Sequence, residues 1–432
     1  MVSAWSIGRS LRSRRMLEQI QLCRLNALLA CVVAGNAFYR RKLDGRPVFL
    51  QRIEQLAELP LTRKEELQAD QAAFAPYGSN WTQGLGQPVR VHQTSGSRGQ
   101  PLYWRDDSGS WQALLDNWQA IFEAAGVSAH DRLFFPFHFG PFLGFWTAFE
   151  AGVRSGCLSI AGGGLSTVAR LHMVAAQQAT VVFCTPTYAL RMAEVAAQEG
   201  IQLGELPVRL LLVAGEPGGS VAATRRRIES AWQARVYDHY GMTEIGPAGI
   251  ECAENPGGLH ILESEYIAEV LDPHTLQPVG PGQEGELVVT TLSRWFSPVI
   301  RYRTGDRVRF DPAPCVCGSL FRRFPGGILG RTDDLIFVRG NNVYPSVLED
   351  IVHSFPAVRE FCIEVAEDAT GTVVRLRIES EDGSLRERVV EAVRNRLYFR
   401  PEVEVVAPGT LPRAEMKARR LVRTMSPQRP TD

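Results

Sequence analysis

Between residues 130 and 214, short apolar runs alternate with segments of helical periodicity, and this alternation constrains the fold most. The apolar runs are DRLFFPFHFG, GCLSIAGGG, TVVFCTPT and VRLLLVAGEP, and the helical segments between them are TVARLHMVAAQQA and YALRMAEVAAQEG. Strands and helices in this order are typical of an α/β layered domain. Further strand-like runs follow at RVYDHYG, EGELVVTTL and VIRYRTGDRVRF. We therefore expect a large α/β domain with packed sheets.

The pattern restarts on a smaller scale after Gly330. The runs DLIFVRG, TVVRLRIES and EVEVVAP are strand-like, Pro345 and Ser346 open one helix, and LRERVVEAVRNRLY forms another. Because 432 residues exceed what one hydrophobic core usually serves, we predict a large domain over residues 1–330 and a small α+β lid over residues 331–432. The polar stretch GRTDD is their expected junction, and the basic tail beyond Arg419 is expected to be loosely ordered.

The composition favours a small-molecule substrate. The formal net charge is zero, with 45% hydrophobic and 22% charged residues, so no basic surface for nucleic acid or an anionic membrane is required. Polar residues interrupt the apolar stretch near the start, and we expect an amphipathic helix of a cytoplasmic protein, without a membrane-spanning run. A transit peptide is the alternative, because the start is rich in Arg and Ser and lacks acidic residues before Glu18.

The eight cysteines are too sparse for a secreted disulfide scaffold. Those within apolar stretches are expected to be buried thiols: Cys23, Cys31, Cys157, Cys184 and Cys362.

The segment HQTSGSRGQPLYW, at residues 92–104, has the composition of a phosphate-binding loop. Its glycines allow the backbone to approach a polyphosphate, and Thr94, Ser95 and Ser97 offer hydroxyl groups. The spacing is not that of a Walker motif. Taken alone, the segment is more often an ordinary turn.

Polar side chains follow two later strand-like runs. Thr243 and Glu244 lie after VYD, where a carboxylate at the mouth of a parallel sheet can hold Mg²⁺ beside a phosphate. Asp306 follows a glycine between two strand-like runs, where it can accept both hydroxyls of a ribose. The alternative for Thr243 and Glu244 is a capped helix start, and the alternative for Asp306 is an ordinary turn aspartate.

The last polar segments lie near and after the predicted domain junction. Arg331 can pair with phosphate or ribose, and Asp333 lies where an enzyme that reshapes its site between two reactions needs a hinge. Lys417 stands in LPRAEMKARRLVR near the end of the chain. The alternative for Arg331 and Asp333 is a linker with a solvated ion pair, and the alternative for Lys417 is an exposed lysine of the tail.

In this order and at these separations, the segments resemble the adenylate-forming superfamily, and in detail the phenylacetate-coenzyme A ligase family. The resemblance also includes NAFYRRKL, CTPTYALRMAEVA and VAGEPGG, so it spans nearly the whole chain. It implies a two-domain adenylate-forming fold with a mobile lid, and the activation of a carboxylic acid by ATP.

The resemblance also implies roles for individual residues. Lys417 would bridge the carboxylate and the α-phosphate, Glu244 would bind Mg²⁺, and Asp333 would be the hinge. Glu216 and Pro217 would flank the adenine, Asp306 would hold the ribose hydroxyls, and Arg331 would lie on the ribose or phosphate side. The implied nucleotide contacts are Thr94, Ser95, Gly96, Ser97, Gly99, Gly215, Glu216, Pro217, Tyr240, Gly241, Met242, Thr243, Asp306 and Arg331.

The sequence departs from the family pattern at two positions. Gln100 replaces the usual lysine of the phosphate loop, and Met416 stands where the lysine loop normally has glycine. Neither change removes an atom that the chemistry strictly requires, but together they allow a slowed or altered enzyme.

The segment FFPFHFGPFLGFW, at residues 134–146, matches the stretch that lines the acyl pocket in the resembled family. We assign Phe139 and Phe142 to the substrate pocket and expect an aryl or arylalkyl acid. Plain core packing is the alternative for the other aromatic residues, and His138 either pairs with a substrate hydroxyl or caps a turn.

Three cysteines and a histidine suggest a structural zinc site. Cys252, His260, Cys315 and Cys317 would satisfy a tetrahedral ion, although the last two are spaced C-x-C rather than C-x-x-C. Some members of the resembled family carry zinc on similar loops. Reduced, unligated cysteines are the alternative.

We therefore predict an ATP- and Mg²⁺-dependent ligase that forms an acyl-adenylate and transfers the acyl group to coenzyme A. An adenylating enzyme that uses a carrier-protein pantetheine thiol or an amine is one alternative, and a non-catalytic nucleotide-binding descendant is another. Related enzymes are often homodimers, but no sequence feature identifies an interface.

Overall fold

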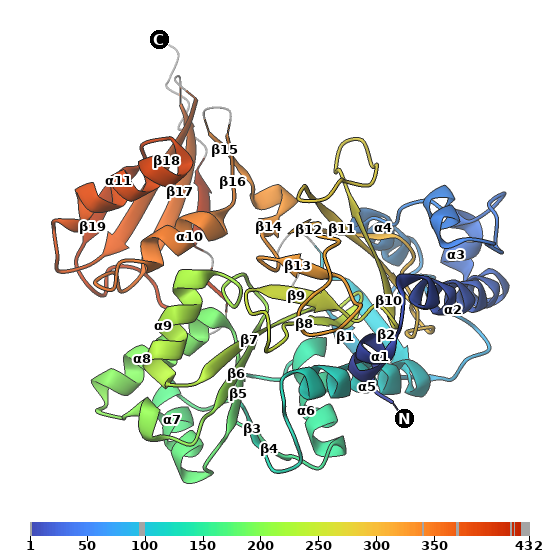
Figure 1. The fold of residues 1–432 in the computed structure, drawn as a ribbon, viewed down its shortest axis with the longest axis horizontal. Helices are drawn as coiled ribbons and strands as arrows, with labels where there is room; N and C mark the ends of the chain where they lie inside the picture. Colours follow the sequence, from blue (N-terminus) through green and yellow to red (C-terminus); the bar gives the residue numbers. More distant parts are fainter. Residues whose placement is uncertain are drawn as a thin grey trace.

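The computed structural model describes residues 2–94, 100–338, 341–368, 371–414, 417–418 and 420–424. The chain begins with helices that lie on one side of the large domain (Figure 1). Ser3, Ser13 and Asn36 cap the first three of them by accepting a backbone N–H group. These helices are α1 (Ala4–Ser10), α2 (Arg14–Gly35), α3 (Ala37–Lys42), the 3₁₀ helix η1 (Ile53–Glu58) and α4 (Lys64–Ala73).

An eight-stranded sheet forms the centre of the large domain, in the order β13-β9-β8-β7-β6-β5-β3-β4. The strands from β4 to β7 run parallel, and β8, β9 and β13 continue the sheet antiparallel. Strands β3 to β6 coincide with the apolar runs expected from the sequence. The bounds are β3 (Arg132–Phe135), β4 (Leu158–Ala161), β5 (Val181–Cys184), β6 (Leu210–Ala214), β7 (Arg235–Met242), β8 (Gly246–Ile250), β9 (Gly258–Ile261) and β13 (Arg323–Pro325).

Helices cover both faces of this sheet. Val182 and Leu211 point into a core with α7, α8 and α9, whereas their neighbours Val181 and Leu210 point into the larger core that includes α5. A strand buried on both faces must be apolar at every position, which explains the continuous runs in the sequence. The helices are α5 (Ser108–Ala124), α6 (Leu143–Arg154), α7 (Thr167–Ala176), α8 (Pro186–Gln198), η2 (Leu203–Glu205) and α9 (Ala222–Trp232).

Two smaller sheets complete the large domain. One has the order β10-β11-β12-β14 and the other is the antiparallel pair β1-β2. Residues 94–102, which include the predicted phosphate loop, connect β1 to β2. The bounds are β1 (Pro88–Gln93), β2 (Tyr103–Asp107), β10 (Tyr266–Leu271), β11 (Glu284–Thr291), β12 (Tyr302–Arg309) and β14 (Gly330–Arg331), followed by η3 (Thr332–Asp334).

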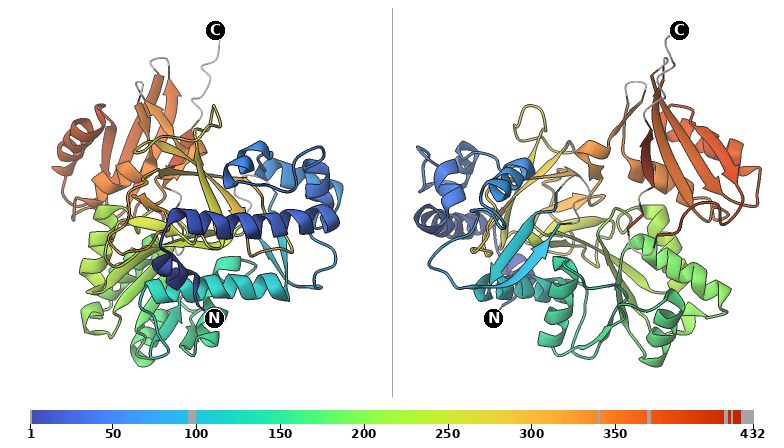
Figure 2. Two further views of the ribbon diagram at one scale, coloured as in Figure 1. Left: turned by 45° about the vertical axis from the view of Figure 1, so that its right-hand side comes forward. Right: turned by 180° about the vertical axis from the view of Figure 1, so that it is seen from behind.

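The C-terminal part has its own hydrophobic core, between Ile336 and Val403. It packs helices against the four-stranded sheet β19-β18-β17-β20, and Figure 2 shows it beside α8 and α9. The expectation of a loose tail is wrong at its start, because β20 pairs parallel with β17. The elements are β15 (Ile336–Val338), β16 (Asn341–Val343), α10 (Pro345–His353), β17 (Phe361–Asp368), β18 (Gly371–Glu379), α11 (Leu385–Leu397), β19 (Glu402–Val406) and β20 (Leu421–Thr424).

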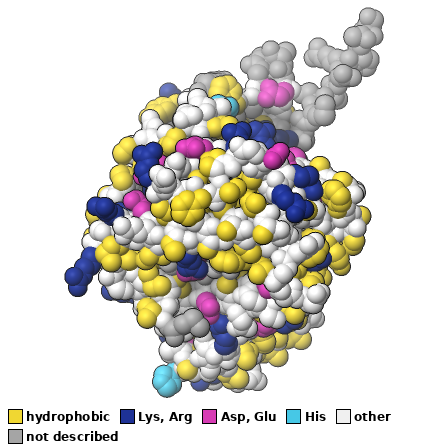
Figure 3. Space-filling view, turned by 90° about the vertical axis from the view of Figure 1, so that its right-hand side faces the viewer, with side chains coloured by type: hydrophobic (Ala, Val, Ile, Leu, Met, Phe, Trp, Pro, Cys, Tyr) yellow, Lys and Arg dark blue, Asp and Glu magenta, His cyan; other side chains and the backbone are white. Residues whose placement is uncertain are grey.

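Among the described residues, only α2 is long and apolar enough to cross a membrane by length and composition, a test that core helices also pass. Its inner face is buried, and the Gln21 side-chain amide donates to the carbonyls of Glu263 and Tyr266 at 2.9 and 3.0 Å. On this side of the molecule, hydrophobic side chains are interspersed with charged ones (Figure 3). Here α2 serves as a packing helix of the large domain.

Candidate active site

The carboxyl ends of β6 and β7 bring the predicted adenine segments together. Gly215 directly follows β6, and Tyr240, Gly241 and Met242 end the neighbouring parallel strand β7. Gly215 has a φ of +95°, and a Cβ atom there would lie 2.8 Å from Cε of Lys417. Because of this short distance, a side chain at position 215 would displace the lysine. Ligands of open α/β sheets bind at this edge of the sheet.

The predicted ribose ligand Asp306 lies on β12 and is buried. The Tyr240 hydroxyl donates to one of its carboxylate oxygens at 2.7 Å, and Arg331 donates to the other at 2.8 Å. Register explains the second contact, because Asp306 and Arg331 are paired residues of β12 and β14. Burial raises the pKa of Asp306, and the Arg331 charge opposes this shift. The structure thus groups three predicted nucleotide contacts.

Glu244 is buried, with 2% of its surface exposed, and has two partners that the sequence did not indicate. The Lys64 ammonium lies 3.2 Å from its Oε1, and the Tyr302 hydroxyl donates to the same oxygen at 3.1 Å. Lys64 begins α4, and Gln68, one turn later, donates its amide to the Gln100 carbonyl at 2.8 Å. This face of α4 therefore lies beside both Glu244 and the end of the predicted phosphate loop.

A buried ion pair supports the Thr243–Glu244 turn. Arg294 binds both carboxylate oxygens of Asp106 at 2.6 Å, and its remaining nitrogen donates to the Thr243 carbonyl at 2.6 Å. A bidentate pair of this kind fixes geometry as well as charge. No sequence pattern indicated this pair, since its partners lie 188 positions apart.

Lys417 reaches this group from the C-terminal part of the chain. Although much of the residue is exposed, desolvation of the amino group lowers its pKa, and the charges of Glu216 and Asp306 oppose that shift. The side chain of Glu216 lies between α8 and the backbone that follows Lys417. Its carboxylate accepts the N–H groups of Thr187 at 2.8 Å and Ala418 at 3.0 Å.

The structure describes the predicted phosphate loop at its two ends, Thr94 and Gln100. Thr94 is buried, and its hydroxyl oxygen accepts the Leu102 N–H at 2.9 Å, so it closes the base of the loop. The predicted residues Ser95, Gly96, Ser97 and Gly99 lie outside the described residues, as does Met416.

The predicted hinge residue Asp333 lies exposed in η3, between β14 and the C-terminal core. Its backbone carbonyl accepts a bond from Arg423 at 3.4 Å. Pro217 is half-buried in the loop after β6.

The aromatic run at 134–146 divides into a strand end, a turn and a helix start. The half-buried ring of Phe139 packs edge to face on Phe149, with 5.2 Å between centroids, and lies tilted against Trp146, with 4.9 Å between centroids. Phe142 is half-buried at the N-cap of α6, and His138 is exposed. Phe139 and Phe142 thus flank the turn that follows β3.

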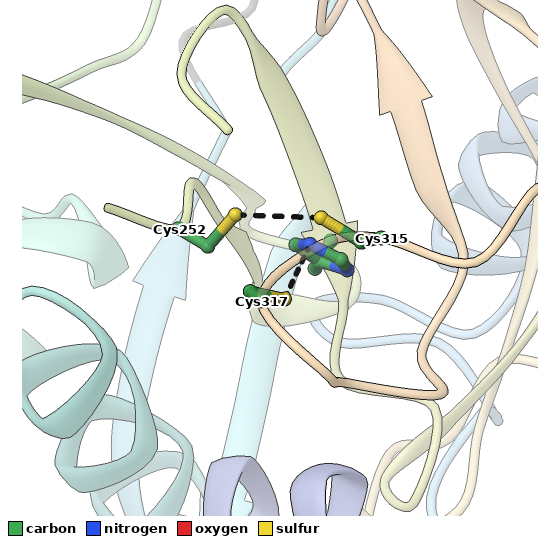
Figure 4. A group of neighbouring side chains, drawn as sticks. Cys252, Cys315 and Cys317 are labelled. Atoms are coloured by element: carbon green, nitrogen blue, oxygen red, sulfur yellow. Dashed lines mark hydrogen bonds between the residues drawn. The ribbon is translucent and has the colours of Figure 1, made fainter. Parts of the chain in front are cut away.

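The predicted zinc ligands meet in one buried cluster (Figure 4). The Sγ atoms of Cys252 and Cys315 lie 3.7 Å apart, and Cys317 Sγ lies 3.6 Å from Nε2 of His260. A tetrahedral zinc ion would separate two sulfurs by about 3.8 Å and a sulfur from a nitrogen by about 3.5 Å. Nδ1 of His260 lies 2.9 Å from the Phe321 carbonyl, a bond that leaves Nε2 free to bind a metal. The donor set therefore fits zinc.

The other cysteines only partly follow expectation. Cys157 and Cys184 are buried, but Cys31 and Cys362 are intermediate and Cys23 is exposed. Cys23 lies on the outer face of α2. The helix packs against the domain with its other face only, so an apolar residue on the outer face stays exposed.

Comparisons with known proteins agree with this geometry. A family model described as AMP-binding enzyme matches residues 7–293, and one described as AMP-binding enzyme C-terminal domain matches residues 340–424. The phenylacetate-coenzyme A ligase of Pseudomonas putida is 31% identical over 93% of this chain and 93% of its own length. That of Escherichia coli K12 is 30% identical over 94% of both.

A solved structure of 2-hydroxyisobutyryl-CoA ligase is also similar over nearly the full length. In its postadenylation state with 2-HIB-AMP it has a TM-score of 0.91 and 27% identity, covering 96% of this chain and 91% of that one. The same ligase in the thioesterification state gives a TM-score of 0.73, with 97% and 92% coverage.

The fold and the matched models define an adenylate-forming enzyme of two-domain α/β type, as predicted. The chain belongs to the AMP-binding enzyme family and, within it, to the phenylacetate-coenzyme A ligase family. The predicted enzyme class, an ATP-dependent, AMP-forming acid–CoA ligase, is thereby confirmed.

Proposed function

We propose that this ligase activates an aryl or arylalkyl carboxylic acid and that Lys417, Glu244 and Thr243 carry the adenylation step. The observation behind this proposal is the convergence of Lys417 with Gly215, Asp306 and Arg331, although these residues lie far apart in the sequence. The curated relatives named for phenylacetate support an aromatic acid, as do Phe139 and Phe142 beside β3.

In the proposed first step, a carboxylate oxygen attacks the α-phosphorus of ATP and pyrophosphate leaves. Negative charge accumulates on the α-phosphate oxygens, and the Lys417 ammonium stabilises it. Asp306 accepts the ribose hydroxyls and Arg331 lies beside them, while segments 215–217 and 240–242 flank the adenine. The loop at Thr94, Ser95, Gly96, Ser97 and Gly99 holds the phosphates.

In the second step, the thiol of coenzyme A attacks the acyl carbon and AMP leaves. Lys417 must withdraw for this, which requires rotation of the lid about Asp333, between domains of residues 1–330 and 331–432. The two states of 2-hydroxyisobutyryl-CoA ligase support such a motion, because this chain superposes with a TM-score of 0.91 on one and 0.73 on the other. A carrier-protein pantetheine is the alternative acceptor, which competition with coenzyme A would reveal.

Lys64 compensates for Gln100 in this proposal. Its ammonium lies 3.2 Å from Glu244, and its helix contacts Gln100 through Gln68. It therefore places an ammonium group beside the loop in which Gln100 replaces the lysine of the family pattern.

Two metals belong to the proposal. Glu244 would hold Mg²⁺, which when bound neutralises phosphate charge. Cys252, His260, Cys315 and Cys317 would hold zinc, and four protein ligands leave no position for substrate, so this ion is structural. The eight cysteines form no disulfide, which suits a reducing compartment such as the cytoplasm.

The test is acid-dependent exchange of pyrophosphate into ATP across aryl, arylalkyl and fatty acids, for the wild type and Lys417→Ala. We expect exchange with an aromatic acid and a loss of about 100-fold or more in the variant, because a preorganised charged donor contributes on the order of 3 kcal/mol. Exchange with fatty acids alone would refute the acid class. An undiminished variant would refute the role of Lys417.

A further inference from the structure

A row of polar contacts joins the lid to the N-terminal ends of α8 and α9. In α9, the Ala223 N–H donates to Asp350 at 2.7 Å, and the Thr224 hydroxyl lies 2.7 Å from Nδ1 of His353. Because the first N–H groups of a helix have no partner within it, they are free to bind acceptors from another domain. The lid therefore docks at helix ends rather than on a flat apolar face.

Glu216 occupies the centre of this row. Its Oε1 accepts the N–H of Thr187, in the first turn of α8, at 2.8 Å, and its Oε2 accepts the N–H of Ala418 at 3.0 Å. Ala418 directly follows Lys417 in the sequence. One carboxylate thus joins the large domain to the backbone that carries the reactive ammonium.

Arg420 reinforces the same connection from the lid side. Its guanidinium pairs with Glu360 of the lid at 2.8 Å, and another of its nitrogens donates to the Thr187 hydroxyl at 3.1 Å. Thr187 therefore meets the lid through Glu216 and through Arg420. The lid residues that make these two bonds, Ala418 and Arg420, lie one and three positions after Lys417.

We propose that Glu216 is a positioning residue that holds the Lys417 loop in the adenylating arrangement and releases it for the thiol step. The inference rests on the proposed adenylation by Lys417. When the lid rotates, Glu216 loses the Ala418 N–H and keeps that of Thr187, so its partners differ between the two half-reactions. Since Glu216 also belongs to the segment that flanks the adenine, nucleotide binding and lid docking share one residue.

A purely structural role predicts something different. If Glu216 only capped α8, its replacement would destabilise the large domain and slow both half-reactions alike. If its side chain only bound adenine, replacement would raise the KM for ATP. The proposed role lowers the kcat of adenylation alone.

The experiment compares Glu216→Gln with the wild type in each half-reaction separately. Glutamine keeps one acceptor oxygen but presents an NH₂ group to the other N–H, so one charge-assisted bond is lost. We expect the kcat of pyrophosphate exchange to fall about 10- to 100-fold. Thioester formation from supplied acyl-adenylate and coenzyme A should stay within about twofold. Equal losses in both, or an unchanged exchange rate, would overturn the inference.

Two further variants and a second measurement complete the test. Thr187→Val removes the hydroxyl that Arg420 binds but keeps the N–H, and should give a smaller loss of the same kind. Glu381→Gln, at an exposed lid carboxylate paired with Arg359, is the matched control.

Hydrogen exchange of a peptide containing Ala418 should quicken in Glu216→Gln and not in the control. This readout needs no acid, so a wild type inactive with every acid would count against the proposed substrate class and leave Glu216 still tested.

Discussion

The Cys/His cluster and the lid interface both join segments that are distant in the sequence, but they do so in opposite ways. The cluster residues Cys252, His260, Cys315 and Cys317 are at most 8% exposed, and their donor atoms all face one another. At the lid interface, Arg413 and Glu194 meet at 3.3 Å with side chains 20% and 27% exposed.

This difference separates permanent from exchangeable contacts. A closed cluster can be broken only by exposing buried thiols, whereas each single hydrogen bond at the lid can be replaced by one to water at little net cost. In the proposed mechanism, the large domain therefore stays fixed while the lid moves. Variants of the Cys/His cluster should therefore change stability, whereas variants of the lid interface should change the balance between the two half-reactions.

Disrupting the cluster should have the largest effect. Cys252→Ser removes one thiolate and should lower the free energy of unfolding of the large domain by about 4–5 kcal/mol, because loss of a structural metal belongs to the most damaging class of change. Thermal unfolding and zinc content measure this together. We expect one equivalent of zinc in the wild type and a marked loss of it in the variant.

Cys23→Ser, at an exposed thiol on α2, is the matched control and should change neither quantity. A metal-free wild type whose unfolding temperature is unaffected by chelators would contradict the zinc assignment and leave the cluster as reduced thiols.

Loss of the Lys64 charge should have an intermediate effect on activity. Lys64→Met removes a charge beside Glu244, and we expect exchange to fall about 10- to 100-fold, the scale of a charge-assisted contact. Adding Gln100→Lys should restore part of the rate, because the ammonium returns to the phosphate loop. Pyrophosphate exchange at varied ATP concentration measures both variants.

Lys42→Met is the control, since Lys42 pairs with Glu66 on the neighbouring surface. If the Lys64 variant were fully active, Gln100 would need no substitute, and the departure of the loop from the family pattern would have no mechanistic consequence.

The sequence predicted the layered domain well because its parallel strands are buried on both faces. Runs such as VVFC and LLLVA must then be wholly apolar, and glycines or prolines mark their ends. The aromatic run at 134–146 was harder, since aromatic residues suit a strand, a turn and a helix alike. It contains the end of β3 at Phe135 and the start of α6 at Leu143.

Site residues were predictable where they stand in a recognisable segment, and not where chain folding alone brings them in. Lys64 is an ordinary lysine at a helix start, and only the fold sets it against a carboxylate 180 positions away. The sequence likewise indicated that Glu216 lies near the nucleotide, but not that its side chain turns to the lid. Such directions depend on where the helix ends of α8 and α9 meet the lid.

The smallest effect concerns how the lid interface responds to pH. Burial raises the pKa of Glu349, in α10, to about 7. The charge of Arg420 opposes this shift, whereas the nearby carboxylates Glu216 and Glu360 add to it. Because the folded pKa of Glu349 exceeds its unfolded value of 4.5, its stabilising contribution is complete below about pH 4.5 and is lost as pH rises through 7. His353 acts in the opposite sense: burial lowers its pKa well below 6.5, so its contribution is lost as pH falls.

Comparing Glu349→Gln with the wild type at each pH separates these opposing terms, since His353 is common to both. The variant should be more stable at pH 8 by on the order of 1 kcal/mol, after allowance for solvent screening, and no more stable at pH 4.5. Thermal unfolding across this range measures the difference, with exposed Glu391→Gln on α11 as the control. A constant difference at every pH would mean that Glu349 keeps one protonation state throughout. The contrast between the lid interface and the closed cluster would then rest on hydrogen bonding alone.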